Sequence, residues 1–264
     1  MYIHNLDPDI ISFGFFTLRW YSLSYILGIL LGWWLGFKLL YLRKNDIPFE
    51  VGKQLFDNFI TYIIISLILG GRIGYVIFYN PAYYLLNPLD IIKIWEGGMS
   101  FHGALLGIIF GTIIFSKKNN LNPFVFLDIV ASVSPIGLLF GRIANFINGE
   151  LYGKITDVSW GVIFPLVDNN PRHPSQIYEA ILEGFVLFII LLVAYLKTSY
   201  KKGICSSLFL IFYSVFRIFC ENFREPDNQL GYIFYNLSMG TLLSLIMLFS
   251  GIIIFFITKK NEYQ

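Results

Sequence analysis

The sequence contains few charged residues and almost no cysteine. Only 14% of its 264 residues are charged, whereas a soluble domain carries about 25%. Disordered chains and nucleic-acid-binding domains depend on charge, so the composition excludes both, and the net charge of +2 does not suggest a polyanionic partner. Two cysteines, Cys205 and Cys220, are too few for a disulfide scaffold or a metal site. We therefore expect packed free thiols, no metal and no cofactor.

Hydrophobic residues are abundant instead, at 56% of the chain, which makes a lipid bilayer the natural solvent. A helix needs about 20 mostly apolar residues to cross a membrane, and other lipid-exposed backbone is too costly. The sequence predicts an all-α polytopic membrane protein with one integral membrane domain over residues 1–264. Its seven transmembrane helices are expected at residues 20–42, 56–78, 99–115, 124–147, 177–196, 204–219 and 237–257.

The placement of lysine and arginine predicts the orientation, because cytoplasmic connections carry the excess of positive charge. The connections after the first, third and fifth spans and the C-terminus hold eleven basic residues: Lys38, Arg43, Lys44, Lys53, Lys117, Lys118, Lys197, Lys201, Lys202, Lys259 and Lys260. The other side holds five: Arg19, Lys93, Lys154, Arg172 and Arg224. The N-terminus is therefore expected outside and the C-terminus in the cytoplasm. The first residues, with Asp7 and Asp9 and no basic start, do not resemble a cleaved signal peptide.

Three arginines lie inside or at the ends of spans that run outward: Arg72, Arg142 and Arg217. His102, near the start of the third span, is expected at the same depth. An arginine at the centre of a span costs about 2.5–3.5 kcal/mol on insertion scales, and less near the interface. Snorkelling to lipid headgroups would explain any one of them. Three arginines with a histidine on one side favour a shared polar site at the outer leaflet.

The sixth span ends with a polar stripe. Tyr213, Arg217, Glu221 and Arg224 are spaced by four, four and three residues, which places them on one helical face. Glu221 is expected to orient the arginines by ion pairing. The alternative is a salt-bridged helix end that faces water.

The end of the fourth span is also polar. Arg142 and Asn145 share a helical face that Asn148 continues, and asparagine side chains both donate and accept hydrogen bonds. Gly149 and Gly153 allow a sharp turn or the close approach of a ligand.

Two histidines on the outer side have open interpretations. His102 opens the third span between small residues and is either a satisfied hydrogen-bonding group or a chemical one. His173 lies in a proline-bounded connection, where it contacts a ligand or makes a loop hydrogen bond. Ser175, after that connection, is predicted to be a helix N-cap.

These motifs resemble the prolipoprotein diacylglyceryl transferase family, and they follow the family's order over nearly the whole chain. The resemblance rests on Arg19-Trp20-Tyr21, Gly70 to Tyr75, Phe101-His102-Gly103, Gly141 to Gly153, Pro171 to Glu179 and Phe216 to Asp227. Ala104 and Ala144 stand where relatives often have glycine. Both are small, so the chemistry is unaffected.

The resemblance implies transfer of the diacylglyceryl group from phosphatidylglycerol to the lipobox cysteine thiol of prolipoproteins. The products are a thioether and sn-glycerol 1-phosphate, in the first step of bacterial lipoprotein maturation. The implied location is the inner membrane, with the active site facing the outer leaflet. The implied catalytic residues are His102, Arg217 and Glu150. Those implied for phosphatidylglycerol binding are Arg142, Asn145, Tyr21, Gly153, Tyr213, Glu221 and Arg224.

The chemistry of the residues agrees with that reaction. Guanidinium groups bind phosphate bidentately, and arginines aimed at the leaving oxygen would stabilise the transition state. A thiol with a pKa near 8.5 needs activation, for which His102, Glu150 and the positive field of the arginines are alternatives. A different class of function, a lipid or anion transporter that uses the arginines as a phosphate site, is the second hypothesis.

Overall fold

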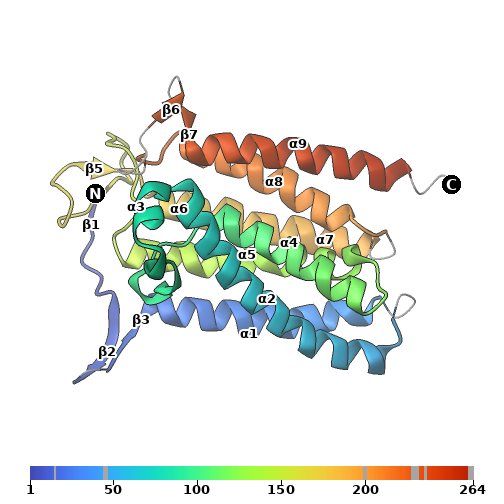
Figure 1. The fold of residues 1–264 in the computed structure, drawn as a ribbon. Helices are drawn as coiled ribbons and strands as arrows, with labels where there is room; N and C mark the ends of the chain where they lie inside the picture. The colour runs from blue at the N-terminus through green and yellow to red at the C-terminus, as the bar shows by residue number, and fades with distance from the viewer. Residues whose placement is uncertain (15, 44–46, 199–200, 227–231, 235–236, 261–264) are drawn as a thin grey trace. The chain divides into compact units, whose positions relative to one another are not determined.

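The computed structural model describes residues 1–14, 16–43, 47–198, 201–226, 232–234 and 237–260. Lys44, counted in the charge bias, and Asp227, part of a motif, lie outside these residues. Seven helices in the described part are long and apolar enough to cross a membrane, which confirms the predicted number of spans (Figure 1).

The spanning helices follow the predicted stretches closely. They are α1 (Trp20–Tyr41), α2 (Phe49–Phe78), α4 (Phe101–Lys118), α5 (Pro123–Ile147), the continuous run of α6 (Ser175–Glu179), η3 (Ala180–Val186) and α7 (Leu187–Thr198), α8 (Ile204–Glu221) and α9 (Met239–Lys260). The largest difference is at the start of α2, which begins at Phe49 rather than at residue 56. The apolar count missed its first two turns, because they carry polar residues such as Glu50 and Lys53 and are still helical.

The chain divides into two compact units, one of Met1–Lys38 with Asp128–Gln264 and one of Leu39–Leu127. In the second unit, glycines let α2 and α4 approach closely. A Cβ on Gly70 would overlap the carbonyl oxygen of Gly103, and a Cβ on Gly74 would overlap the Gly103 Cα. Small residues are the usual solution for close helix pairs in lipid. The same unit continues from α2 into α3 (Pro81–Leu86), η1 (Pro88–Ile92) and η2 (Ile94–Glu96) before α4.

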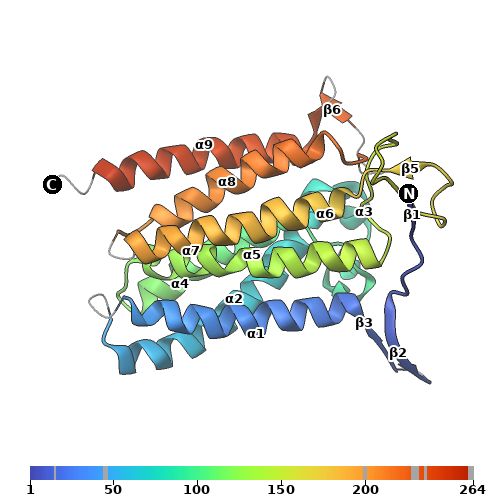
Figure 2. The same cartoon turned by 180° about the vertical axis from the view of Figure 1, so that it is seen from behind.

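In the first unit, α5, α8 and the α6–η3–α7 run are fixed to one another at two places. Gly184 in η3 packs directly on Leu139 of α5, where any side chain would collide. At the other end, the fully buried Asp128 accepts from the backbone N–H groups of Gly203 at 2.8 Å and Ser206 at 2.9 Å. This carboxylate caps the start of α8, where it complements the helix dipole. Figure 2 shows the run from α6 to α7 beside α5, and the contacts set the register between their side chains.

Short strands occur at the helix ends of the first unit. The strands β1 (Tyr2–Ile3), β4 (Val162–Ile163) and β5 (Pro171–Arg172) form a sheet in the order β1-β4-β5. The pair β1 and β4 is parallel, with Tyr2 opposite Val162, and β4 and β5 are antiparallel. The strands β2 (Asp9–Phe13) and β3 (Phe16–Arg19) form an antiparallel hairpin before α1, and β6 (Tyr232–Phe234) pairs with β7 (Leu237–Ser238) before α9.

One local prediction at this end is wrong. The residue in the N-cap position of α6 is Pro174, and Ser175 is the first helical residue. The Ser175 hydroxyl donates to the carbonyl of Leu151 at 3.0 Å, so it ties the loop to the helix instead of capping it.

Candidate active site

Three arginines and three glutamates of the first unit form one buried ion-pair network. The arginines are Arg142 of α5, Arg217 of α8 and Arg224 just after α8, and the carboxylates are Glu179, Glu183 and Glu221. The sequence predicts that Arg142 and Arg217 meet, and the structure brings them together through carboxylates that both contact.

Glu179 is the hub of the network. Its side chain is fully buried, and Oε1 lies 2.6 Å from Arg217 Nη1 and 3.3 Å from Arg224 Nη1. The other oxygen, Oε2, lies 3.0 Å from Arg142 Nη1. One carboxylate at the end of α6 therefore sets the positions of three guanidinium groups from two other segments.

The remaining two carboxylates add further pairs, and Glu183 also lies 3.7 Å from Arg217 Nη1. Glu183, in the π-helical turn η3, lies 3.1 Å from Arg142 Nη2. Glu221 lies 2.9 Å from Arg217 Nη2, as the spacing on α8 predicts, and accepts from the Ser238 hydroxyl at 2.6 Å. Three positive and three negative charges make the network neutral in itself. Since buried ions are stable only when paired, this balance explains how three arginines are tolerated in an apolar bundle.

The Nε atom of Arg142 is different from the rest of its guanidinium. It is buried, and within the described residues it has no hydrogen-bond partner. Both terminal nitrogens are fixed by Glu179 and Glu183. A guanidinium has five N–H donors, so the Nε–H remains able to donate to an anion while the group is held in place. Such a pre-positioned donor edge is what recognition of a phosphodiester requires.

The end of α5 carries a second polar group beside Arg142. The Asn145 side chain donates to Glu150 Oε1 at 2.7 Å, and that of Asn148 donates to the same oxygen at 3.5 Å. The chain turns sharply after α5, where Gly149 has φ +66° and Leu151 has φ +56°. Glu150 is exposed at its side chain, and its backbone carbonyl accepts from Gln176 at 2.6 Å. The predicted grouping of Asn145 with Glu150 is therefore present.

Two tyrosines predicted for the site are related to Arg142, Tyr213 directly and Tyr21 through Tyr25. Tyr213 is buried one turn before Arg217 and lies within electrostatic reach of Arg142. Tyr21, on α1, accepts a hydrogen bond at 3.3 Å from Tyr25, which is itself within electrostatic reach of Arg142.

Gly153 has a structural explanation. Its N–H donates to the His173 carbonyl at 2.9 Å, and it forms a β-bridge with Arg224. A Cβ at this position would overlap the carbonyl oxygens of His173 and Phe223. The close approach predicted for Gly153 is therefore made by its own chain, and this contact fixes the segment that carries Arg224.

The loop beside Gly153 is stabilised by charge and by aromatic packing. Arg172 pairs with Asp168 at 2.6 Å and with Glu225 at 3.3 Å. The hydrogen bond from Arg172 lowers the pKa of Asp168 to about 2. His173 Nδ1 lies 3.1 Å from the Tyr178 hydroxyl, and burial lowers the pKa of the imidazole. Of the two interpretations of His173, the structure contains the loop hydrogen bond.

Two residues expected in the shared polar site belong to the other unit. His102 lies in the first turn of α4, so its role in the reaction stays a prediction. Arg72 is buried in α2 and donates to the backbone carbonyls of residues 90, 91, 97 and 98 of its own unit. These bonds hold the guanidinium within its own unit, and a polar site shared with Arg142 and Arg217 stays a prediction.

Sequence reasoning missed Glu179 and Glu183, although a signal was present. Both are carboxylates within the apolar stretch of the fifth predicted span, and they are four residues apart, on one helical face. A carboxylate in a span is costly unless it faces a partner. Two on one face, opposite spans with arginines, could have identified the counter-charges.

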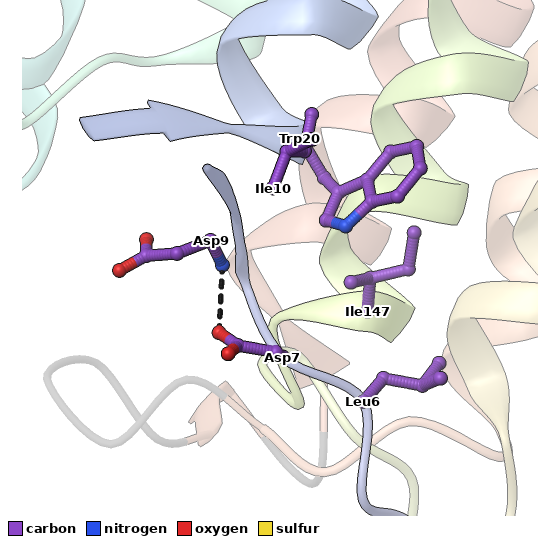
Figure 3. A pocket seen from close by; sticks show the side chains of 6 residues that line it. All are labelled: Leu6, Asp7, Asp9, Ile10, Trp20 and Ile147. Carbon is purple, nitrogen blue, oxygen red and sulfur yellow. Dashed lines mark hydrogen bonds between the residues drawn. The ribbon is translucent and has the colours of Figure 1, made fainter. Parts of the chain in front are cut away.

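A pocket of about 290 Å³ lies beside the ends of α1 and α5 (Figure 3). It is lined by Leu6, Asp7, Asp9, Ile10, Trp20 and Ile147. Its charged lining residues are both acidic, so it does not suit an anionic group, and the arginine network remains the candidate site.

The chain is similar to known proteins over nearly its whole length. A family model described as prolipoprotein diacylglyceryl transferase matches residues 8–257. The phosphatidylglycerol–prolipoprotein diacylglyceryl transferase of Rickettsia bellii is 53% identical over 250 residues, which cover 94% of each chain. That of Rickettsia typhi is 52% identical over 253 residues, 95% of this chain and 96% of the relative.

Proposed function

The chain belongs to the prolipoprotein diacylglyceryl transferase family, and on that premise we propose that its buried arginine network binds the phosphodiester of phosphatidylglycerol. The protein is a multi-pass membrane enzyme that transfers the diacylglyceryl group of this lipid to the lipobox cysteine of a prolipoprotein. The substrates are those in the names of its relatives.

The free Nε edge of Arg142 is the observation that carries the proposal. This edge is buried, and the guanidinium is held from behind by Glu179 and Glu183, so little conformational freedom is lost when an anion binds. Asn145 lies one turn further along α5 and supplies a neutral donor for a glycerol or phosphate oxygen. Tyr21, Tyr213 and Gly153 complete the proposed binding region, Gly153 by fixing the loop that carries Arg224.

The reaction places a specific demand on Arg217. The acceptor sulfur attacks the glyceryl carbon, a carbon–sulfur bond forms, and the carbon–oxygen bond to phosphate breaks. The electron pair leaves with the phosphate oxygen, whose negative charge therefore rises in the transition state. Arg217 is held by Glu179 and Glu221 and supplies fixed positive charge for that oxygen. Because the charge is already in place, stabilising the transition state requires no reorganisation of the site.

The thiol proton needs an acceptor, because the unperturbed thiol pKa is near 8.5. We assign this role to His102, whose unperturbed pKa near 6.5 suits proton transfer close to neutral pH. Glu150 is the rival base. Its carboxylate is exposed in the turn after α5 and accepts a hydrogen bond from Asn145.

We also propose that the site faces the outer leaflet. The support is the excess of lysine and arginine on the opposite side of the predicted topology. This orientation places the N-terminus and residues 148–174 outside and the C-terminus in the cytoplasm.

A turnover assay tests the function against the alternative of a lipid or anion transporter. Detergent-purified protein, phosphatidylglycerol and a lipobox peptide should yield a diacylglyceryl-peptide and sn-glycerol 1-phosphate, identified by mass. A peptide with serine in place of cysteine is the matched control and should remain unmodified. Phosphate or lipid movement across vesicles without any product would support the transporter instead.

A further inference from the structure

We propose that residues 81–96 form a membrane-surface anchor, which lies in the lipid interface and is fastened to α2 by Arg72. The segment comprises α3, η1 and η2 and belongs entirely to the second unit. The inference is independent of the proposed chemistry, because it concerns which surface of the protein touches lipid.

The outer side of the segment is apolar and exposed. Leu85 and Leu86 are 83% exposed, Leu89 is 78%, Trp95 is 75% and Ile92 is 70% exposed. Single exposed apolar residues are normal on a protein surface. Five highly exposed apolar side chains within eleven consecutive positions instead mark an interaction site.

The inner side of the segment is polar and is already satisfied. Arg72 Nε donates to the Ile91 carbonyl at 2.9 Å, and its terminal nitrogens donate to the carbonyls of Asp90 at 2.7 Å and of Gly98 at 3.2 Å, as well as to Gly97. Arg72 as a whole is 4% exposed. The segment has no long helix to satisfy all of its backbone carbonyls. Arg72 supplies hydrogen-bond donors to several of them, and backbone near lipid must be hydrogen-bonded in this way.

Aromatic and charged contacts complete the fastening. The Arg72 guanidinium lies 5.3 Å from the ring centroid of Tyr84, whose side chain is buried. Lys93 pairs with Asp90 at 2.6 Å, so these two charges compensate each other. The segment is thus two-sided: backbone carbonyls bond to Arg72 on one side, and the leucines and Trp95 are exposed on the other.

The position of the segment identifies lipid as the occupant. It begins just after α2 ends at Phe78 and returns to α4 at Phe101, and both helices are long and apolar enough to span a membrane. Gly97 and Gly98, at φ +85° and +79°, make the return turn. Its apolar face is therefore continuous with the lipid-facing surface of this helix pair, at the depth where tryptophan and amphipathic segments concentrate.

A fluorescence-quenching experiment tests the proposal. Leu89→Cys, labelled with bimane, is compared with Asn169→Cys on the exposed polar loop before β5, in vesicles of phosphatidylcholine and phosphatidylglycerol. The native Cys205 and Cys220 are buried and do not compete for label. Lipid with a quencher near its headgroup should quench the Leu89 label at least about threefold more than the Asn169 label, and iodide in water should do the reverse.

Three results would overturn the proposal. The Leu89 label would be as open to iodide as the Asn169 label if the segment projected into water. It would be protected from both quenchers if another protein surface or a second copy covered the segment. The role of Arg72 is tested by Arg72→Lys in the labelled background, because an ammonium lacks the planar fork that serves several carbonyls. Iodide quenching at Leu89 should rise about twofold, and an unchanged signal would contradict the fastening role.

Discussion

Replacing Glu179 with glutamine removes a charge on which three arginines depend, while the size of the side chain is kept. In the native network, Arg142, Arg217 and Arg224 all contact this carboxylate, and its side chain is fully buried. Glutamine leaves three positive charges facing two negative ones. It also places an amide N–H₂ group opposite guanidinium N–H groups. Both are donors, so no hydrogen bond forms between them.

The geometry gives the size of the effect. Removing one partner from a buried ion pair costs about 3–5 kcal/mol. For a chain of this size each kcal/mol corresponds to about 2–4 °C, so the melting temperature should fall by about 6–20 °C. The chemical step should slow by about 10²–10³, the usual loss when a preorganised electrostatic group is displaced.

Steady-state kinetics with phosphatidylglycerol and a lipobox peptide, together with thermal unfolding in detergent, would measure both effects. Glu225→Gln is the matched control. Its side chain is 43% exposed and pairs with Arg172 at 3.3 Å, so it should change stability by less than about 1 kcal/mol and leave kcat nearly unchanged. If Glu179→Gln behaves like Glu225→Gln in both assays, Glu179 does not organise the arginines and the reasoning fails.

Further predictions follow from the same structure. A cysteine at Asn169 should react with a membrane-impermeant reagent in intact cells and one at Lys117 only after permeabilisation; the reverse pattern would invert the proposed topology. His102→Gln should lose most activity at pH 7 and recover part of it near pH 9, as the thiol ionises unaided, whereas a normal rate with an unchanged pH profile would assign activation to the arginine field. The lowered pKa of Asp168 contributes stability above its unfolded pKa that disappears as pH falls toward about 2. Asp168→Asn should therefore melt below the wild type at pH 7 and converge with it near pH 2, and a constant difference would exclude the ion pair with Arg172 as the cause.

The helices could be predicted from the sequence because lipid imposes a simple requirement on them. A span must be apolar over its crossing length, so stretches such as the predicted 124–147 nearly coincide with α5, Pro123–Ile147. The start of α2 was missed for the same reason. Its first turns, which carry Glu50 and Lys53, extend beyond the apolar stretch, where hydrophobicity carries no information about helicity.

The site was only half predictable. Helical spacing correctly placed Arg217 and Glu221 together, because both lie on α8 and local geometry suffices. The hub, Glu179, could not be assigned in this way, since its partners come from helices that are distant in sequence. Their alignment depends on Gly184 packing against Leu139 and on the carboxylate cap of Asp128, which only the folded structure reveals.

Arg72 shows a further limit of sequence reasoning. Its sequence context resembles that of Arg142, since each follows a glycine near the end of a span and precedes isoleucine. The two guanidinium groups nevertheless have different partners, backbone carbonyls for Arg72 and carboxylates for Arg142. Composition around an arginine therefore does not distinguish a residue that holds backbone from one that is poised to bind an anion.

The most direct test of the account is the Arg142→Lys variant, because lysine keeps the charge and loses the Nε edge. In the diacylglyceryl transfer assay, kcat/KM for phosphatidylglycerol should fall by at least about 10²-fold. Arg172→Lys is the control, since it alters another buried arginine, whose donors go to Asp168, Glu225 and the Gly153 carbonyl. It should lose stability and keep kcat/KM within about fivefold. Activity of Arg142→Lys within that same range would show that Arg142 acts only as a point charge and would contradict the proposed grip on the donor phosphate.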